Sequence, residues 1–99
     1  MTKYDVYVMC ERINPGKTYS VPSNPYDGNA KVVETGLLNF DGLIKLAKKY
    51  NTTLSQGEQW LYSLNPPTDP KTGDKLYYTI HVDPEDRDIL DDVAEYFRQ

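Results

Sequence analysis

Cysteine, histidine and long apolar runs are all scarce in this sequence. Its 99 residues hold one cysteine, Cys10, and one histidine, His81. A single cysteine cannot form an intrachain disulfide, and a zinc site needs several cysteine or histidine ligands at fixed spacing. No stretch approaches the roughly 20 apolar residues that a membrane-spanning helix requires. These shortages exclude a disulfide framework, a typical zinc site and a transmembrane helix from the expected structure.

The first residues run directly into an alternating segment. No charged stretch followed by an apolar run comes after Met1, so we expect no signal peptide. A cytoplasmic protein in a reducing environment is the resulting expectation. A chain of 99 residues has room for one hydrophobic core, and we expect a single domain over residues 1–99.

Acidic residues outnumber basic ones, and their excess lies in the second half of the chain. The formal net charge is −4, with +2 on residues 1–50 and −6 on residues 51–99. Phosphate contacts need clustered cations, so this balance favours a basic protein partner over nucleic acid. Negative charge also aids solubility, and that simpler interpretation stays open at this point.

Alternation over residues 4–13 predicts the first strand. One face would carry Val6, Val8 and Cys10, and the other Asp5, Tyr7, Met9 and Glu11. The second face is half apolar, which indicates a central strand covered on both sides. A second strand is expected over residues 30–38, with a break at Gly36.

Residues 14–30 lack any periodicity and predict a long irregular loop. Asn14-Pro15-Gly16 has the proline and glycine that a type II turn requires. Two of the nine tyrosines, Tyr19 and Tyr26, fall in this loop. Tyrosine gives a large contact area at little cost in rotamer entropy, so both are candidate binding residues.

The next segment predicts a helix that ends at Tyr50, with Asn39 or Asp41 as its cap. Its apolar positions follow the helical period: Leu43, Leu46, Ala47 and Tyr50. Three lysines gather on the opposite side: Lys45, Lys48 and Lys49. This segment is therefore expected to pack one face on a sheet and expose the other.

Residues 51–64 allow two interpretations. Ser55-Gln56-Gly57-Glu58 fits a capping box and a short helix over 56–64. A strand from Gln59 to Leu64 is the alternative, with Trp60, Tyr62 and Leu64 on one face. We favour the strand, because the turn residues of 69–74 precede a clean alternation from Lys75 to Val82. This arrangement indicates a hairpin closed by a left-handed glycine.

The last element is an amphipathic helix over residues 84–98. Asp83 would cap it, and Pro84 would take the first helical position. Its apolar stripe is formed by Ile89, Leu90, Val93, Ala94 and Phe97. The resulting order, β-β-α-β-β-α, predicts an α+β fold, in which a small antiparallel sheet of about four strands carries two helices on one face.

Enzymatic motifs are weak throughout. His81 is the only candidate base, and Asp83 follows it at the spacing of one strand face. No serine or cysteine can be placed beside it, so we predict no catalytic residues and no enzymatic activity. The segment 35–42 has two glycines but no phosphate-loop spacing. The acidic run 83–88 lacks the glycine of a calcium loop, and we predict no metal and no cofactor.

A segment in the middle of the chain resembles helix-turn-helix DNA-binding segments. The resemblance rests on Leu46-Ala47-Lys48-Lys49-Tyr50-Asn51-Thr52-Thr53 followed by Trp60-Leu61. It implies a nucleic-acid-binding regulator that uses residues 43–62. Gly57 departs from the pattern, because a recognition helix does not favour glycine. We keep this regulator as the alternative function.

Negative charge is concentrated at the end of the chain. Residues 83–95 hold seven carboxylates against one cation, Arg87. Four of them recur at helical spacing and would share one side: Asp88, Asp91, Asp92 and Glu95. Like charges at this spacing repel, so a surface that serves only solubility would be expected to include lysines. A solvated helix face is the plain interpretation, and a binding surface is the functional one.

The preferred hypothesis is a non-enzymatic binding module that engages a basic partner surface through this acidic helix. In size and charge the chain is similar to the small acidic inhibitors and decoys of phages and mobile elements. Such a row of carboxylates can enter a basic groove that normally holds nucleic acid. Direct nucleic-acid binding and membrane association are not expected, and the sequence leaves the oligomeric state open.

Overall fold

A computed structural model of the chain describes residues 2–16, 30–55 and 60–99. These residues form five strands, a short 3₁₀ turn and two α-helices. In chain order the elements are β1 (Tyr4–Ile13), β2 (Ala30–Leu38), α1 (Phe40–Tyr50), β3 (Leu54–Ser55), β4 (Leu61–Tyr62), β5 (Lys75–Val82), η1 (Pro84–Asp86) and α2 (Asp88–Arg98).

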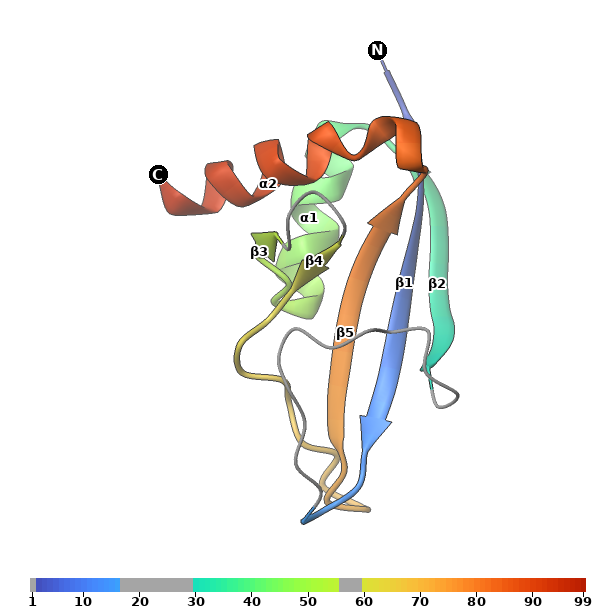
Figure 1. Cartoon of the computed structure of the whole chain (residues 1–99), viewed down its shortest axis with the longest axis vertical. Helices are drawn as coiled ribbons and strands as arrows, with labels where there is room; N and C mark the ends of the chain where they lie inside the picture. Colours follow the sequence, from blue (N-terminus) through green and yellow to red (C-terminus); the bar gives the residue numbers. More distant parts are fainter. Residues whose placement is uncertain (1, 17–29, 56–59) are drawn as a thin grey trace.

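The strands form one antiparallel sheet in the order β2-β1-β5-β4-β3. The long strands β2, β1 and β5 dominate it, and Figure 1 shows them side by side. β1 spans the predicted residues and lies between β2 and β5, as a central strand should. Its two faces are both covered in part, because Val8 and its neighbour Met9 are both buried.

β2 covers the predicted residues but has its irregularity elsewhere. The strand continues through Gly36, which pairs with Val6. The predicted break at Gly36 is therefore wrong. The pairing register instead shifts between Val8 and Met9, so that Val33 is passed over as a bulge. A bulge inserts one residue into a strand while hydrogen bonding resumes on both sides, which alternation alone does not reveal.

Both helices pack on the same face of the sheet, to the left of the long strands in the view of Figure 1. The core contains residues from five elements: Val6, Val8, Leu43, Ile44, Leu46, Ala47, Leu61, Ile80, Val82, Leu90, Val93 and Ala94. The α+β fold with two helices on one face of an antiparallel sheet is thus confirmed. The short β3 is an additional strand, so the order is β-β-α-β-β-β-α.

Helix α1 forms where the sequence predicted it. The Asn39 side chain accepts a hydrogen bond from the Gly42 backbone N–H at 2.8 Å, which satisfies a free donor of the first turn. Asn51 ends the helix in the left-handed conformation, with φ of 54°. Its backbone N–H caps the carbonyls of Ala47 and Lys48.

The segment after α1 follows the strand interpretation. Leu61 pairs with Ile80 of β5 and is fully buried in the core. β4 is only two residues long, and residues 56–59 lie outside the described part of the chain. Within the described residues of this segment, 51–55 and 60–64, we find no second helix for a helix-turn-helix motif.

The C-terminal helix is shorter than predicted. Pro84–Asp86 forms a 3₁₀ turn, and the α-helix begins only at Asp88. Asp83 precedes the turn without making a side-chain capping bond, so the predicted cap is wrong. Neither of the helices described is long and apolar enough to cross a membrane.

Candidate binding surface on helix α2

The buried side of α2 determines which side of the helix its carboxylates occupy. Leu90, Val93 and Ala94 are almost completely buried against the core. Residues three and four positions apart share a side of a helix, so the carboxylates lie on the opposite side. Asp88, Asp92 and Glu95 are all exposed there, and we call these three residues the acidic surface.

Asp91 differs from the other three predicted site residues. Asp91 is only partly exposed, and its Oδ1 accepts a hydrogen bond from Ser55 Oγ at 2.9 Å. Asp91 therefore ties α2 to strand β3. The sequence did not reveal this contact, because β3 has only two residues and was not predicted.

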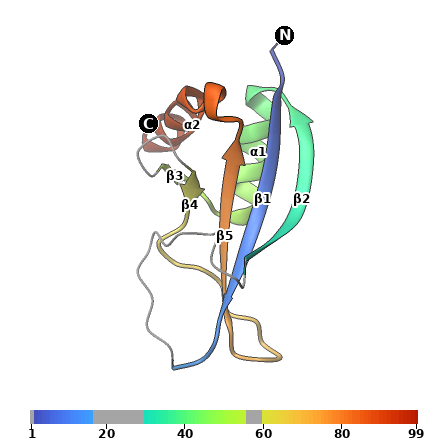
Figure 2. The same ribbon diagram turned by 45° about the vertical axis from the view of Figure 1, so that its right-hand side comes forward.

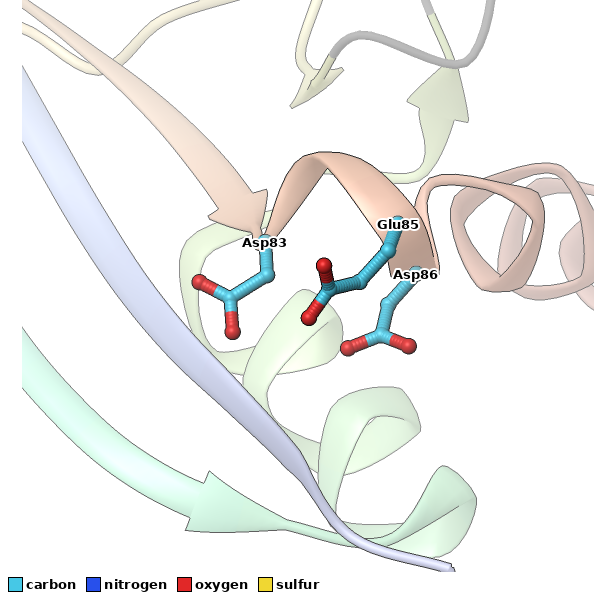
Figure 3. Close-up of side chains that lie close together, drawn as sticks. All are labelled: Asp83, Glu85 and Asp86. Carbon is cyan, nitrogen blue, oxygen red and sulfur yellow. The ribbon is translucent and has the colours of Figure 1, made fainter.

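A second group of carboxylates precedes the acidic surface. Figure 3 shows the side chains of Asp83, Glu85 and Asp86 pointing to the same side of the 3₁₀ turn. One carboxylate oxygen from each of the three residues lies within 4.8 Å of the other two. With one oxygen from each residue, the group supplies three of the six to eight oxygens that Ca²⁺ takes, and the turn has no calcium-loop sequence. The group therefore adds negative potential beside the acidic surface.

None of these carboxylates is neutralised by a cation of the described chain. The ion pairs found among residues 2–16, 30–55 and 60–99 lie elsewhere: Arg12 with Asp69 and Asp74, and Lys49 with Glu34. Arg87 stands one position before the helix, and the ion pairs found among the described residues do not include it. The negative charge of this region is therefore left to solvent or to a partner.

One aromatic side chain on α2 was missed by the sequence analysis. Tyr96 is 45% exposed, and its ring meets that of Phe97 edge-on at 5.2 Å. The Lys48 Nζ lies 6.0 Å from the centre of the Tyr96 ring. Tyr96 stands four residues after Asp92 and falls outside the apolar stripe, which is the signal that could have indicated it.

The predicted lysine cluster is divided between two neighbours. Lys49 bonds Glu34 of β2 at 2.8 Å, and Tyr50 donates a hydrogen bond to the same carboxylate oxygen at 2.6 Å. These two bonds hold the pKa of Glu34 below its usual value. Lys48 instead lies toward Tyr96 of α2, so the three lysines do not act as one patch.

His81 is buried in an aromatic group rather than placed at a reactive centre. Its ring stacks on Tyr7 at 4.9 Å, and Trp60 lies at 6.1 Å. Nε2 shares a 2.8 Å hydrogen bond with Thr79 Oγ1. Burial lowers the pKa of His81 to about 4. A ring with that pKa is neutral at pH 7 and is a weak base, which fits a packing role better than catalysis.

Cys10 is likewise buried, and burial raises the pKa of its thiol. A raised pKa keeps the sulfur protonated and poorly nucleophilic. The remaining predicted site residues, Tyr19 and Tyr26, lie outside the described residues. Most of the predicted loop 14–30 lies there too, although Gly16 has the positive φ, 82°, that the predicted type II turn needs.

Comparisons with known proteins add no assignment to this geometry. No family model matches the chain, and neither a curated protein nor a solved structure matches it. The acidic surface is therefore interpreted from its own residues.

Proposed function

We propose that this chain is a non-enzymatic binding module that engages a basic protein surface through the acidic surface of α2. One observation carries the proposal. Asp88, Asp92 and Glu95 are exposed on one side of the helix, and no cation of the described chain pairs with them.

The energetics of the helix support this role. Asp88 and Asp92 are four residues apart, and Asp92 and Glu95 are three apart, so each pair places like charges side by side. Such a pair destabilises a helix by a few tenths of a kcal/mol. Cations of a basic partner attract these carboxylates and offset the repulsion between them. The electrostatic field of such a partner also speeds association.

Shape and position support the same role. Figure 1 shows α2 crossing one end of the sheet, with its C-terminal part projecting beyond β3 and β4. The exposed ring of Tyr96 adds apolar contact area next to the charges. Tyr19 and Tyr26 complete the proposed contact set. An inhibitor or decoy in the cytoplasm, which occupies a basic groove of its target, is the kind of protein this describes.

A paired charge reversal tests the proposal. The variant Asp92→Lys/Glu95→Lys changes two exposed residues of the acidic surface. The control Asp5→Lys/Asp41→Lys makes the same charge change at exposed residues of β1 and α1. Tagged proteins capture partners from host lysate at low and high salt, and the association rate with each captured protein is then measured.

We expect the α2 variant to lose its partner and the control to keep it. Binding by the wild type should weaken steeply with salt, since ions screen long-range attraction. A partner held equally by both variants would contradict the proposal. A third arm uses duplex DNA with Lys45, Lys48 and Lys49 reversed to glutamate. DNA binding that these lysines control would instead favour the nucleic-acid-binding alternative.

A further inference from the structure

The open edge of β2 is a second surface with a distinct chemistry. β2 is nine residues long and ends the order of the described strands, and no strand lies beyond it in Figures 1 and 2. Val32, Val33 and Leu37 are 55%, 49% and 58% exposed. A long edge with exposed apolar side chains offers unpaired backbone groups to another strand.

The two faces of this edge differ in character. Val32 pairs with Met9 and Leu37 pairs with Asp5, which places both on the face away from the helices. On the helix face, Lys31 pairs with Cys10, whose side chain lies on the same side as Val8 of the core. The edge is therefore apolar on one face and basic on the other.

Two hollows continue the basic character along the helix face. One lies between β2 and α1 and is lined by Glu34, Leu38, Gly42, Lys45, Leu46 and Lys49. The other lies between β1 and β2 and is lined by Cys10, Arg12, Lys31 and Val33. Glu34 is already bonded to Lys49, and Arg12 to Asp69 and Asp74. Lys31 and Lys45 form no ion pair with any residue of the described segments.

We propose that the β2 edge binds an extended peptide in which acidic and apolar residues alternate. The peptide adds an antiparallel or parallel strand along Glu34 to Leu38 and continues past the bulge at Val33 to Lys31. Because side chains alternate between faces, its acidic residues meet Lys31 and Lys45 on the helix face. Its apolar residues then cover Val32 and Leu37 on the other face. This surface is separate from the acidic surface of α2, and neither depends on the other.

Charge also decides against a second copy of this chain as the occupant. A symmetric pair of β2 strands about an axis perpendicular to the sheet would place both helix faces on the same side. Lys31 and Lys45 of one copy would then approach the same lysines of the other.

The first experiment measures fluorescence anisotropy of a labelled peptide of nine residues, the length of β2, in which glutamate alternates with valine. The control peptide carries lysine in place of glutamate. We expect saturable binding of the first peptide and none of the second. Equal binding of both, or of neither, would overturn the proposal.

Two protein variants locate the contact. Lys31→Glu/Lys45→Glu should weaken binding of the glutamate peptide by about tenfold or more. This is the loss expected when two solvent-exposed attractive charge pairs become repulsive. Lys48→Glu/Lys71→Glu changes the same charge at lysines away from the β2 edge and should leave binding within about twofold. Equal losses in the two variants would mean that only net charge matters, and the edge proposal would be wrong.

Backbone pairing is tested by methylating alternate amides of the peptide. An added strand uses the amides of one edge only, so one methylated series should lose binding and the other should keep it. Retention by both series would exclude strand addition. The oligomeric state of the free protein is measured by sedimentation equilibrium, and we expect a monomer. A dimer that the variant Val33→Lys abolishes would instead assign the β2 edge to a second copy of the chain.

Discussion

Arg12 and Asp69 lie 57 residues apart in the chain, yet Arg12 Nη2 and Asp69 Oδ2 are 2.6 Å apart. The same guanidinium donates to Asp74 Oδ2 at 3.2 Å and to Thr72 Oγ1 at 3.1 Å. One side chain of β1 therefore holds the loop between β4 and β5. The hydrogen bond from Arg12 lowers the pKa of Asp69.

Arg12→Lys should loosen that loop, because an ammonium cannot reproduce the planar fork that reaches both carboxylates. We expect faster hydrogen exchange at the Gly73 amide, which bonds the Asp69 carbonyl at 2.8 Å. Lys75→Ala removes an exposed cation of β5 and serves as the control. Unchanged exchange in Arg12→Lys would show that the loop is held by its own turn bonds.

Leu90→Ala should lower the free energy of unfolding by about 2 to 4 kcal/mol, since Leu90 is fully buried and its loss leaves a cavity. Urea unfolding followed by circular dichroism measures the change. Asp92→Ala, on the exposed side of the same helix, should alter stability by less than about 0.5 kcal/mol. Comparable losses of unfolding free energy in both variants would mean that the substitutions act on the helix itself and not on its packing against the core.

His81 should make the fold acid-sensitive between about pH 6.5 and pH 4. Its pKa is about 4 in the folded state and 6.5 when exposed, so the unfolded chain binds the extra proton in this range. Stability is therefore complete above pH 6.5 and declines as the pH falls, by about 3 kcal/mol at most.

His81→Gln removes the titrating ring, and its unfolding free energy should vary less between pH 7 and pH 5 than that of the wild type. Urea titrations at the two pH values provide the measurement. We also expect no hydrolytic or transfer activity that His81→Gln abolishes. A robust activity lost in a folded His81→Gln protein would reverse the non-enzymatic assignment.

Ser55→Ala should destabilise the protein by about 1 kcal/mol, because it removes the 2.9 Å hydrogen bond to Asp91. Thermal unfolding of Ser55→Ala, Asp91→Ala and the double variant forms a cycle that isolates the pair. Asp88→Ala is the matched control, as Asp88 is exposed. Additive losses in the double variant would show that the two groups do not interact.

Local patterns predicted the elements whose signals lie within a few residues. Alternation placed β1 at Tyr4–Ile13, and Asn39 with the helical period placed α1. The loop glycine was also predictable, since Gly73 has the positive φ, 77°, that a tight turn requires. The apolar stripe of α2 was predicted together with its opposite acidic side, so Asp88, Asp92 and Glu95 could be named in advance.

Tertiary structure decided the features that depend on distant partners. β3 has only two residues and therefore shows no periodicity. The hydrogen bond from Ser55 to Asp91, which separates Asp91 from the acidic surface, could not be predicted from the sequence. Whether a strand is central or at an edge depends on sheet order, and only the fold places Lys45 beside the open edge of β2. Periodicity is a property of neighbouring residues, whereas pairing and burial are set by contacts across the whole chain.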